Sequence, residues 1–179
     1  NKMKIEIIPA GEKYRSIVTN LARYYIYDFS PYIHQQSEWY RCQKGGNFNS
    51  GMGHYFKDPA SSVFLIRVDG EWAGFAMVRA MQDDPDVDFN LAEFFITRPL
   101  RGKGIGRHVA HTLFDKFKGR WDLLVLPANE PAILFWEKVV AEYTRGTAQT
   151  TFSCEHRHRH DQRLCIHRFS SRKKPRKKR

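Results

Sequence analysis

Three glycines at every second position, interleaved with basic residues, form the stretch whose residue types and spacing most clearly suggest chemistry. Its members are Arg101, Gly102, Lys103, Gly104, Ile105, Gly106 and Arg107. Glycine lacks a Cβ atom, so the backbone can adopt positive φ and approach a ligand closely. The stretch opens an amphipathic segment, and the unpaired N–H groups at a helix start favour anions. Together with the three cations, this predicts a phosphate or pyrophosphate site.

The spacing of the glycines excludes two common nucleotide loops. A dinucleotide-binding loop needs G-x-G-x-x-G, but Val109 stands three residues after Gly106, and a G-x-x-x-x-G-K-[ST] loop is absent. The sequence instead reads Arg-x-x-Gly-x-Gly over 101–106, after the apolar run 94–96. This arrangement resembles the acyl-CoA loop of the GNAT acetyltransferase superfamily. The alternative is a basic, glycine-rich turn without a ligand.

A second segment supports the same resemblance. The pattern Asn129-x-x-Ala132-x-x-Phe135-Trp136-x-Lys138 is similar to the late helix of that family, where an asparagine and an aromatic pair flank the CoA arm. The resemblance implies that Asn129, Phe135 and Trp136 contact the pantetheine. Asn129 is also a suitable N-cap, and the two roles are compatible.

The resemblance further implies acetyl-CoA as the acyl donor, in the gap between a strand at 87–97 and a strand at 122–126. The backbone of Phe95, Ile96 and Thr97 would then pair with the pantetheine, and the N–H groups of 102–107 would receive the pyrophosphate. One strand N–H would polarise the thioester carbonyl.

Acyl transfer to an amine needs a base and often an acid. Glu93 is the candidate base, because a carboxylate within the apolar run 91–95 is open to desolvation that raises its pKa. The alternative is a structural ion pair with a neighbouring strand. Many relatives have a tyrosine acid where this chain has Trp136, and indole is not a usable acid. Tyr143 is a further candidate acid, with core packing as the alternative.

The acceptor side is less defined. Tyr27 and Asp28 lie where the family builds its acceptor wall, and their charge and aromatic face suit a cationic amine. They could equally form the rim of the core. The acceptor itself is an unidentified primary amine.

The run from Cys154 to His160, followed by Cys165 and His167, suggests zinc by composition. The intervening arginines and the absence of C-x-x-C spacing favour a solvated basic hairpin instead. We therefore predict no metal site.

The elements that must position these residues follow from hydrophobic periodicity and turn signals. Strands are expected at 4–8, 63–68, 71–78, 87–97, 122–126, near 152 and at 164–169, and helices at 12–27, 32–42, 109–118 and 130–140, with a loop over 43–59. Asp69-Gly70 marks a tight hairpin. The order predicts an α/β (α+β) fold with a GNAT-like central mixed, mostly antiparallel sheet of about seven strands flanked by about four helices.

The 179 residues, 41% of them hydrophobic, fit one domain at 1–170 followed by a basic tail at 171–179. Residues 172–179 carry seven of the net +11 charges, so the remainder carries 11 − 7 = +4. An odd count of three cysteines and no apolar stretch of about 20 residues favour a cytoplasmic protein without a membrane partner.

The function predicted from these features is transfer of the acetyl group of acetyl-CoA to a primary amine by direct attack, in a monomer or homodimer. One alternative is a non-catalytic acyl-CoA-binding regulatory domain. The other is nucleic-acid binding through the basic tail, which the sequence favours less.

Overall fold

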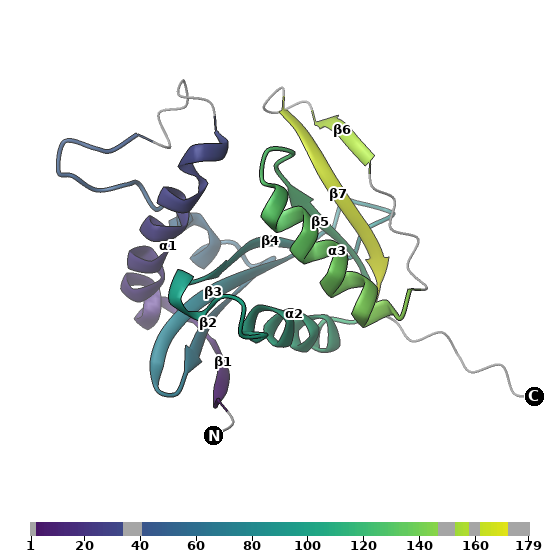
Figure 1. Cartoon of the computed structure of the whole chain (residues 1–179), viewed down its shortest axis with the longest axis horizontal. Helices are drawn as coiled ribbons and strands as arrows, with labels where there is room; N and C mark the ends of the chain where they lie inside the picture. Colours follow the sequence, from purple (N-terminus) through teal and green to yellow (C-terminus); the bar gives the residue numbers. More distant parts are fainter. Residues whose placement is uncertain (1–2, 34–40, 147–152, 158–161, 172–179) are drawn as a thin grey trace, which may run out of the picture. The chain divides into compact units, whose positions relative to one another are not determined.

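The computed structural model of the chain describes residues 3–33, 41–146, 153–157 and 162–171. Figure 1 shows the strands together with the helices α1, α2 and α3. The longer elements are β1 (Ile5–Pro9), α1 (Arg15–Phe29), β2 (Ser61–Val68), β3 (Glu71–Ala80), β4 (Phe89–Ile96), α2 (Ile105–Lys116), β5 (Arg120–Val125), α3 (Glu130–Thr144), β6 (Ser153–Arg157) and β7 (Gln162–Ser170). Short 3-10 helices are η1 (Glu12–Tyr14), η2 (Ser30–Tyr32), η4 (Met52–Phe56) and η5 (Arg98–Leu100).

The seven strands pair in the order β1-β2-β3-β4-β5-β7-β6. β4 and β5 are parallel, through the pairs Phe89↔Trp121 and Asn90↔Asp122. The pairs β1/β2, β2/β3, β5/β7 and β6/β7 are antiparallel. The predicted mixed, mostly antiparallel sheet of about seven strands is confirmed, and the final hairpin with it.

The chain forms two compact units. The first comprises Asn1–Arg79 and Ala92–Gly106, and the second comprises Ala80–Leu91 and Arg107–Arg179. The division falls within β4 and within the first turn of α2, so each unit is built from separate stretches of sequence. The single domain over 1–170 and the tail at 171–179 stay predictions.

The core of the first unit lies between α1 and the strands. One face of α1 is buried through Val18, Leu21, Ala22 and Ile26, in the spacing expected of an amphipathic helix. It packs in one cluster with side chains from β2, β3 and β4, namely Val63, Leu65, Phe75, Met77 and Phe95. Burial of each large apolar side chain contributes about 1.5–3 kcal/mol, so this face fixes α1 on the sheet.

Two glycine positions shape the strands of the first unit. Asp69 and Gly70 have φ of 51° and 90°, which confirms the predicted tight hairpin between β2 and β3. At Gly74 on β3, a Cβ atom would meet the carbonyl oxygen of Phe95 at 1.9 Å. β3 and β4 therefore approach closely only because this residue is glycine.

The second unit has an aromatic core. Phe114 of α2 contacts Trp121 of β5 and Phe169 of β7 with ring centroids 5.0 and 4.7 Å apart. α3 lies beside β7 (Figure 1) and buries Val139 and Val140. Trp121, Asp122, Leu123 and Val125 of β5 are buried, so residues on both faces of this strand are buried, as expected for a central strand.

Some boundaries differ from the prediction. α3 continues to Thr144 rather than ending near 140, and it stops where Arg145 and Gly146 take positive φ. The expected helix over 32–42 falls mainly on 34–40, outside the described residues, and Ile33 at its start is extended. Within the described residues there are three α-helices, and none is long and apolar enough to cross a membrane.

Candidate active site

The glycine loop connects β4 to α2 in the order that the sequence predicted. η5 follows β4, the chain turns through residues 101–104, and α2 begins at Ile105. Gly102 and Gly104 have φ of 75° and 79°, which non-glycine residues rarely adopt. Ile105 is buried and anchors the helix start, whereas residues 101–104 are exposed. The loop therefore presents backbone N–H groups and basic side chains to solvent at a helix start, which suits an anion.

Arg101 is held by the protein itself. Its Nε donates to the carbonyl oxygen of Ile96 at 2.7 Å, and its Nη2 donates to the carboxylate of Asp28 at the end of α1. Asp28 also accepts from Nε of Arg98 at 2.7 Å. The Arg101 guanidinium lies 5.5 Å from the ring centre of Phe95. Asp28 therefore joins α1 to the loop, and its two oxygens are engaged by arginines rather than open to an amine.

The backbone N–H and C=O groups at the end of β4 point alternately toward β3 and away from it. The N–H of Thr97 donates to the carbonyl oxygen of Ala73 on β3 at 2.8 Å, and the carbonyl of Phe95 also faces β3, at Gly74. Because successive peptide groups point to opposite edges of a strand, Ile96 directs its N–H away from β3. Of the three residues predicted to pair with pantetheine, only Ile96 presents its N–H at the edge of β4 that is turned away from β3.

Glu93 lies on β4 three residues before Ile96, with its carboxylate among tyrosines. The Tyr55 hydroxyl on η4 donates to Oε1 of Glu93 at 2.9 Å, and the Tyr25 hydroxyl on α1 also hydrogen-bonds this side chain. Burial raises the pKa of the Glu93 carboxyl above its ordinary value, and the two tyrosine hydrogen bonds oppose that rise. The expected alternative, an ion pair with a neighbouring strand, is not found among the described residues. Glu93 is thus a desolvated carboxylate with neutral partners.

Two tyrosines of α1 remain exposed. Tyr24 and Tyr27 expose 65% and 58% of their surface, and the Tyr27 ring meets Phe48 at 5.5 Å in an edge-to-face contact. This exposure fits the predicted acceptor wall better than it fits core packing. The assignment of Tyr27 to substrate stays a prediction.

The second unit contains the late-helix residues. Oδ1 of Asn129 accepts from the N–H of Ala132 at 3.3 Å, which confirms Asn129 as the N-cap of α3. Phe135 and Trp136 contact each other edge to face at 4.7 Å between ring centroids. Trp136 is buried, with only 8% of its surface exposed. The predicted contacts of these three residues with pantetheine stay predictions.

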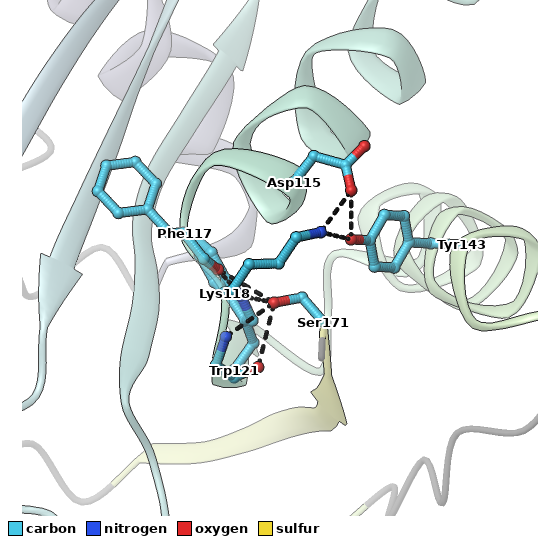
Figure 2. Close-up of polar contacts among 7 residues, drawn as sticks. Asp115, Phe117, Lys118, Trp121, Tyr143 and Ser171 are labelled. Carbon is cyan, nitrogen blue, oxygen red and sulfur yellow. Dashed lines mark hydrogen bonds and ion pairs between the residues drawn. The ribbon is translucent and has the colours of Figure 1, made fainter. Parts of the chain in front are cut away.

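Tyr143 has a packing and bridging role within the second unit. Figure 2 shows its hydroxyl between Asp115 and Lys118, donating to Oδ1 of Asp115 at 2.9 Å and accepting from Nζ of Lys118 at 3.2 Å. Its ring packs on Phe114 at 5.2 Å. Burial raises the pKa of the Tyr143 hydroxyl, which makes it a weaker acid. The packing alternative is therefore favoured over an acid role.

The described residues contain no group of three or more histidine, cysteine or acidic side chains that could hold a metal. The side chains of the run at 154–167 lie outside what the structure describes, so the basic-hairpin interpretation of that run stays a prediction.

Tyr55 was not identified from the sequence as a partner of Glu93. It lies in a segment predicted to be a loop, and nothing in its spacing connects it to Glu93, which is 38 residues away. One signal was present: aromatic residues within the glycine-rich run 51–56 are unusual for a solvated loop. A buried carboxylate also requires donors, and hydroxyls near it in space supply them.

The known proteins that this chain resembles in sequence or fold include several acetyltransferases. The model of the acetyltransferase (GNAT) family matches residues 21–140. No curated protein matches the chain in sequence. Among solved structures, an acetyltransferase from Thermus thermophilus is similar at TM-score 0.63 and 12% identity, covering 93% of this chain and 97% of that one.

Two further structures have named activities. The ribosomal-protein-S18-alanine N-acetyltransferase from Escherichia coli is similar at TM-score 0.58 and 14% identity, over 98% of this chain and 99% of that one. Spermidine N-acetyltransferase from Vibrio cholerae, solved with CoA and spermine, is similar at TM-score 0.56 and 12% identity, with 92% of both chains covered. At these identities the structures support the fold alone, whereas the family model spans 120 of the 179 residues (140 − 21 + 1 = 120). The chain belongs to the GNAT family of acetyltransferases.

Proposed function

We propose that the protein is an N-acetyltransferase that transfers the acetyl group of acetyl-CoA to a primary amine by direct attack. The observation that carries this proposal is Glu93, a desolvated carboxylate on the strand that leads directly into the glycine loop. One continuous segment thus supplies a base and an anion-binding loop. The cytoplasmic location and the monomeric or homodimeric state stay predictions.

The residues of the loop fit the donor. Positive φ at Gly102 and Gly104 turns the chain into the start of α2, where residues 101–104 and Arg107 are exposed. The N–H groups of 102–107 would hold the pyrophosphate of acetyl-CoA, and the N–H of Ile96 would pair with its pantetheine. Arg101 would act by shaping the loop, because its guanidinium is bound to Ile96 and Asp28.

The chemistry assigns Glu93 the role of general base. An amine nitrogen forms a bond to the acetyl carbon as the carbon–sulfur bond breaks, and the proton lost by the amine passes to the Glu93 carboxylate. A base with a raised pKa is better matched to a neutral working pH than an ordinary carboxylate. The sulfur leaves as a thiolate, because a thiol is acidic enough to leave without a protein acid.

Binding of the donor can be tested by thermal unfolding. Acetyl-CoA at roughly 100 times its Kd should stabilise the protein by about 2.7 kcal/mol. Gly104→Val should abolish this stabilisation, because valine is strained at a φ of 79°. Gly11→Val is the matched control, since Gly11 has a φ of −77° and open space where a Cβ would stand. A Gly104→Val variant that retains the full stabilisation would contradict the role of the loop.

A non-catalytic acyl-CoA-binding domain is the second candidate, favoured by Trp136 in place of the family's tyrosine and by the engaged hydroxyl of Tyr143. Release of free thiol across a panel of primary amines distinguishes the two. Turnover with any amine supports the transferase, whereas stabilisation by acetyl-CoA without turnover supports the binding domain.

A further inference from the structure

One carboxylate of the first unit, that of Glu93, has two phenol donors. The donors come from separate segments: Tyr55 from η4 and Tyr25 from α1, while Glu93 belongs to β4. The Tyr55 hydroxyl lies 2.9 Å from Oε1 of Glu93, a normal length for an O–H to carboxylate bond. Three elements distant in sequence thus converge on one side chain.

Both tyrosine rings are fixed by packing. Tyr25 contacts Phe29, Phe75 and Phe95 at centroid distances of 4.7, 5.6 and 5.7 Å. Tyr55 is buried in the core of the first unit, and its ring lies 4.1 Å from that of His54. Aromatic rings with so many neighbours lose little additional freedom when their hydroxyls bond. The two donors are therefore preorganised before any substrate binds.

We propose that Tyr55 is a positioning residue for the acetyl transfer, holding the Glu93 carboxylate together with Tyr25 in the orientation that accepts the proton of the amine. This inference rests on the proposed role of Glu93 as base. It assigns no contact between Tyr55 and the substrate.

The tyrosine hydrogen bonds counteract burial. Burial alone favours the neutral acid, which cannot act as a base, whereas donors to the ionised form favour the carboxylate. Burial, followed by the negative charge of Glu93, raises the pKa of Tyr55, so its hydroxyl remains a neutral donor over the working range. Arg79 on β3 and Asp58 after η4 face Tyr55 with opposite charges. In the described part of the chain, burial and these two tyrosines are the influences that act on Glu93 itself.

The direct test is the titration of Glu93 in the full-length protein. With ¹³C-labelled glutamate, the Glu93 carboxyl resonance is assigned by its loss in Glu93→Gln and followed against pH. Tyr55→Phe keeps the ring and removes one donor to the charged form, so the midpoint should rise by about one pH unit. Tyr14→Phe is the matched control, because Tyr14 packs on the same core, where its ring contacts Trp72 rather than Glu93. It should leave the midpoint unchanged.

A midpoint that Tyr55→Phe leaves unchanged would overturn the proposal. If Tyr55→Phe does not fold, Tyr25→Phe removes the other donor and should raise the same midpoint, with an unchanged midpoint again overturning it. This measurement does not depend on turnover, so it is decided even if no amine is acetylated.

Kinetics then separates positioning from packing. The acid limb of kcat/KM should move to higher pH in Tyr55→Phe by the same amount as the midpoint, with KM for acetyl-CoA unaltered. In a Glu93→Gln background, Tyr55→Phe should have no further effect on residual activity. A loss of activity that is equal at all pH values and persists in that background would show a purely structural role for Tyr55. Failure of turnover in the wild-type protein would instead count against the proposed function.

Discussion

At the scale of single residues, the carboxylates of the first unit differ in what surrounds them. Asp28 is balanced by Arg98 and Arg101, whereas Glu93 has only neutral hydroxyl partners within the described residues. A carboxylate engaged by two cations serves structure. For a carboxylate that is desolvated and hydrogen-bonded to phenols, burial raises the pKa and the hydrogen bonds lower it. A general base needs a pKa that is set by such opposing effects.

Replacing Glu93 by glutamine should lower kcat/KM by about 10²–10⁴, the usual contribution of a general base. It should also change stability with a defined sign. The pKa of Glu93 is raised on folding, so the stability it contributes is present at low pH and is lost as pH rises through the raised pKa.

Glutamine does not ionise, so Glu93→Gln should gain stability relative to wild type as pH rises from the ordinary pKa of a glutamate through the raised pKa of Glu93. Urea unfolding at several pH values measures this difference. A stability difference that is constant with pH would contradict the desolvation of Glu93.

At the scale of elements, α1 is connected to the glycine loop by one acidic side chain. Asp28 exposes only 14% of its side chain and engages two arginines on the segment that follows β4. Residues 101–104 are exposed, so the loop contributes no buried apolar side chain before Ile105. Asp28 and the bond from Arg101 to Ile96 therefore fix the loop conformation.

Asp28→Asn should destabilise the protein by about 1–2 kcal/mol, because the charged half of two hydrogen-bonded ion pairs is lost at a part-buried position. The matched control is Glu12→Gln, which removes the exposed pair between Glu12 and Arg15. That pair should contribute less than about 0.5 kcal/mol. Equal effects of the two substitutions, measured by urea unfolding, would show that the Asp28 cluster does not fix the loop.

At the scale of the whole molecule, positive charge is divided unevenly along the sequence. Seven of the net +11 charges belong to residues 172–179. The last residue that the structure describes, Ser171, is buried and accepts from the N–H of Gly119 while donating to the carbonyl of Phe117 (Figure 2). These bonds connect Ser171 to the segment between α2 and β5.

Removal of residues 172–179 should therefore leave stabilisation by acetyl-CoA unchanged. It should abolish any affinity for nucleic acid that falls steeply with salt, because counterion release depends on those charges. Binding of a labelled oligonucleotide at several salt concentrations, with and without these residues, measures this. Salt-dependent binding that survives the deletion would place the nucleic-acid surface elsewhere.

The order of strands and helices along the chain, the hairpin at Asp69-Gly70, the glycine loop and the cap at Asn129 could all be predicted from the amino-acid sequence. Each of these depends on local rules: hydrophobic period, positive φ at glycine, and a side chain that caps its own helix. These local rules also singled out Glu93 as a carboxylate in an apolar strand.

The partners of these residues could not be predicted in the same way, because they come from distant parts of the chain. Glu93 meets Tyr55 across 38 residues, and Asp28 meets Arg101 across 73, and no local spacing encodes either contact. The same holds for Ile96, whose N–H is directed away from β3 because Thr97 is bound to Ala73. Whether a carboxylate serves as a base or as an anchor is set by the groups that surround it in space.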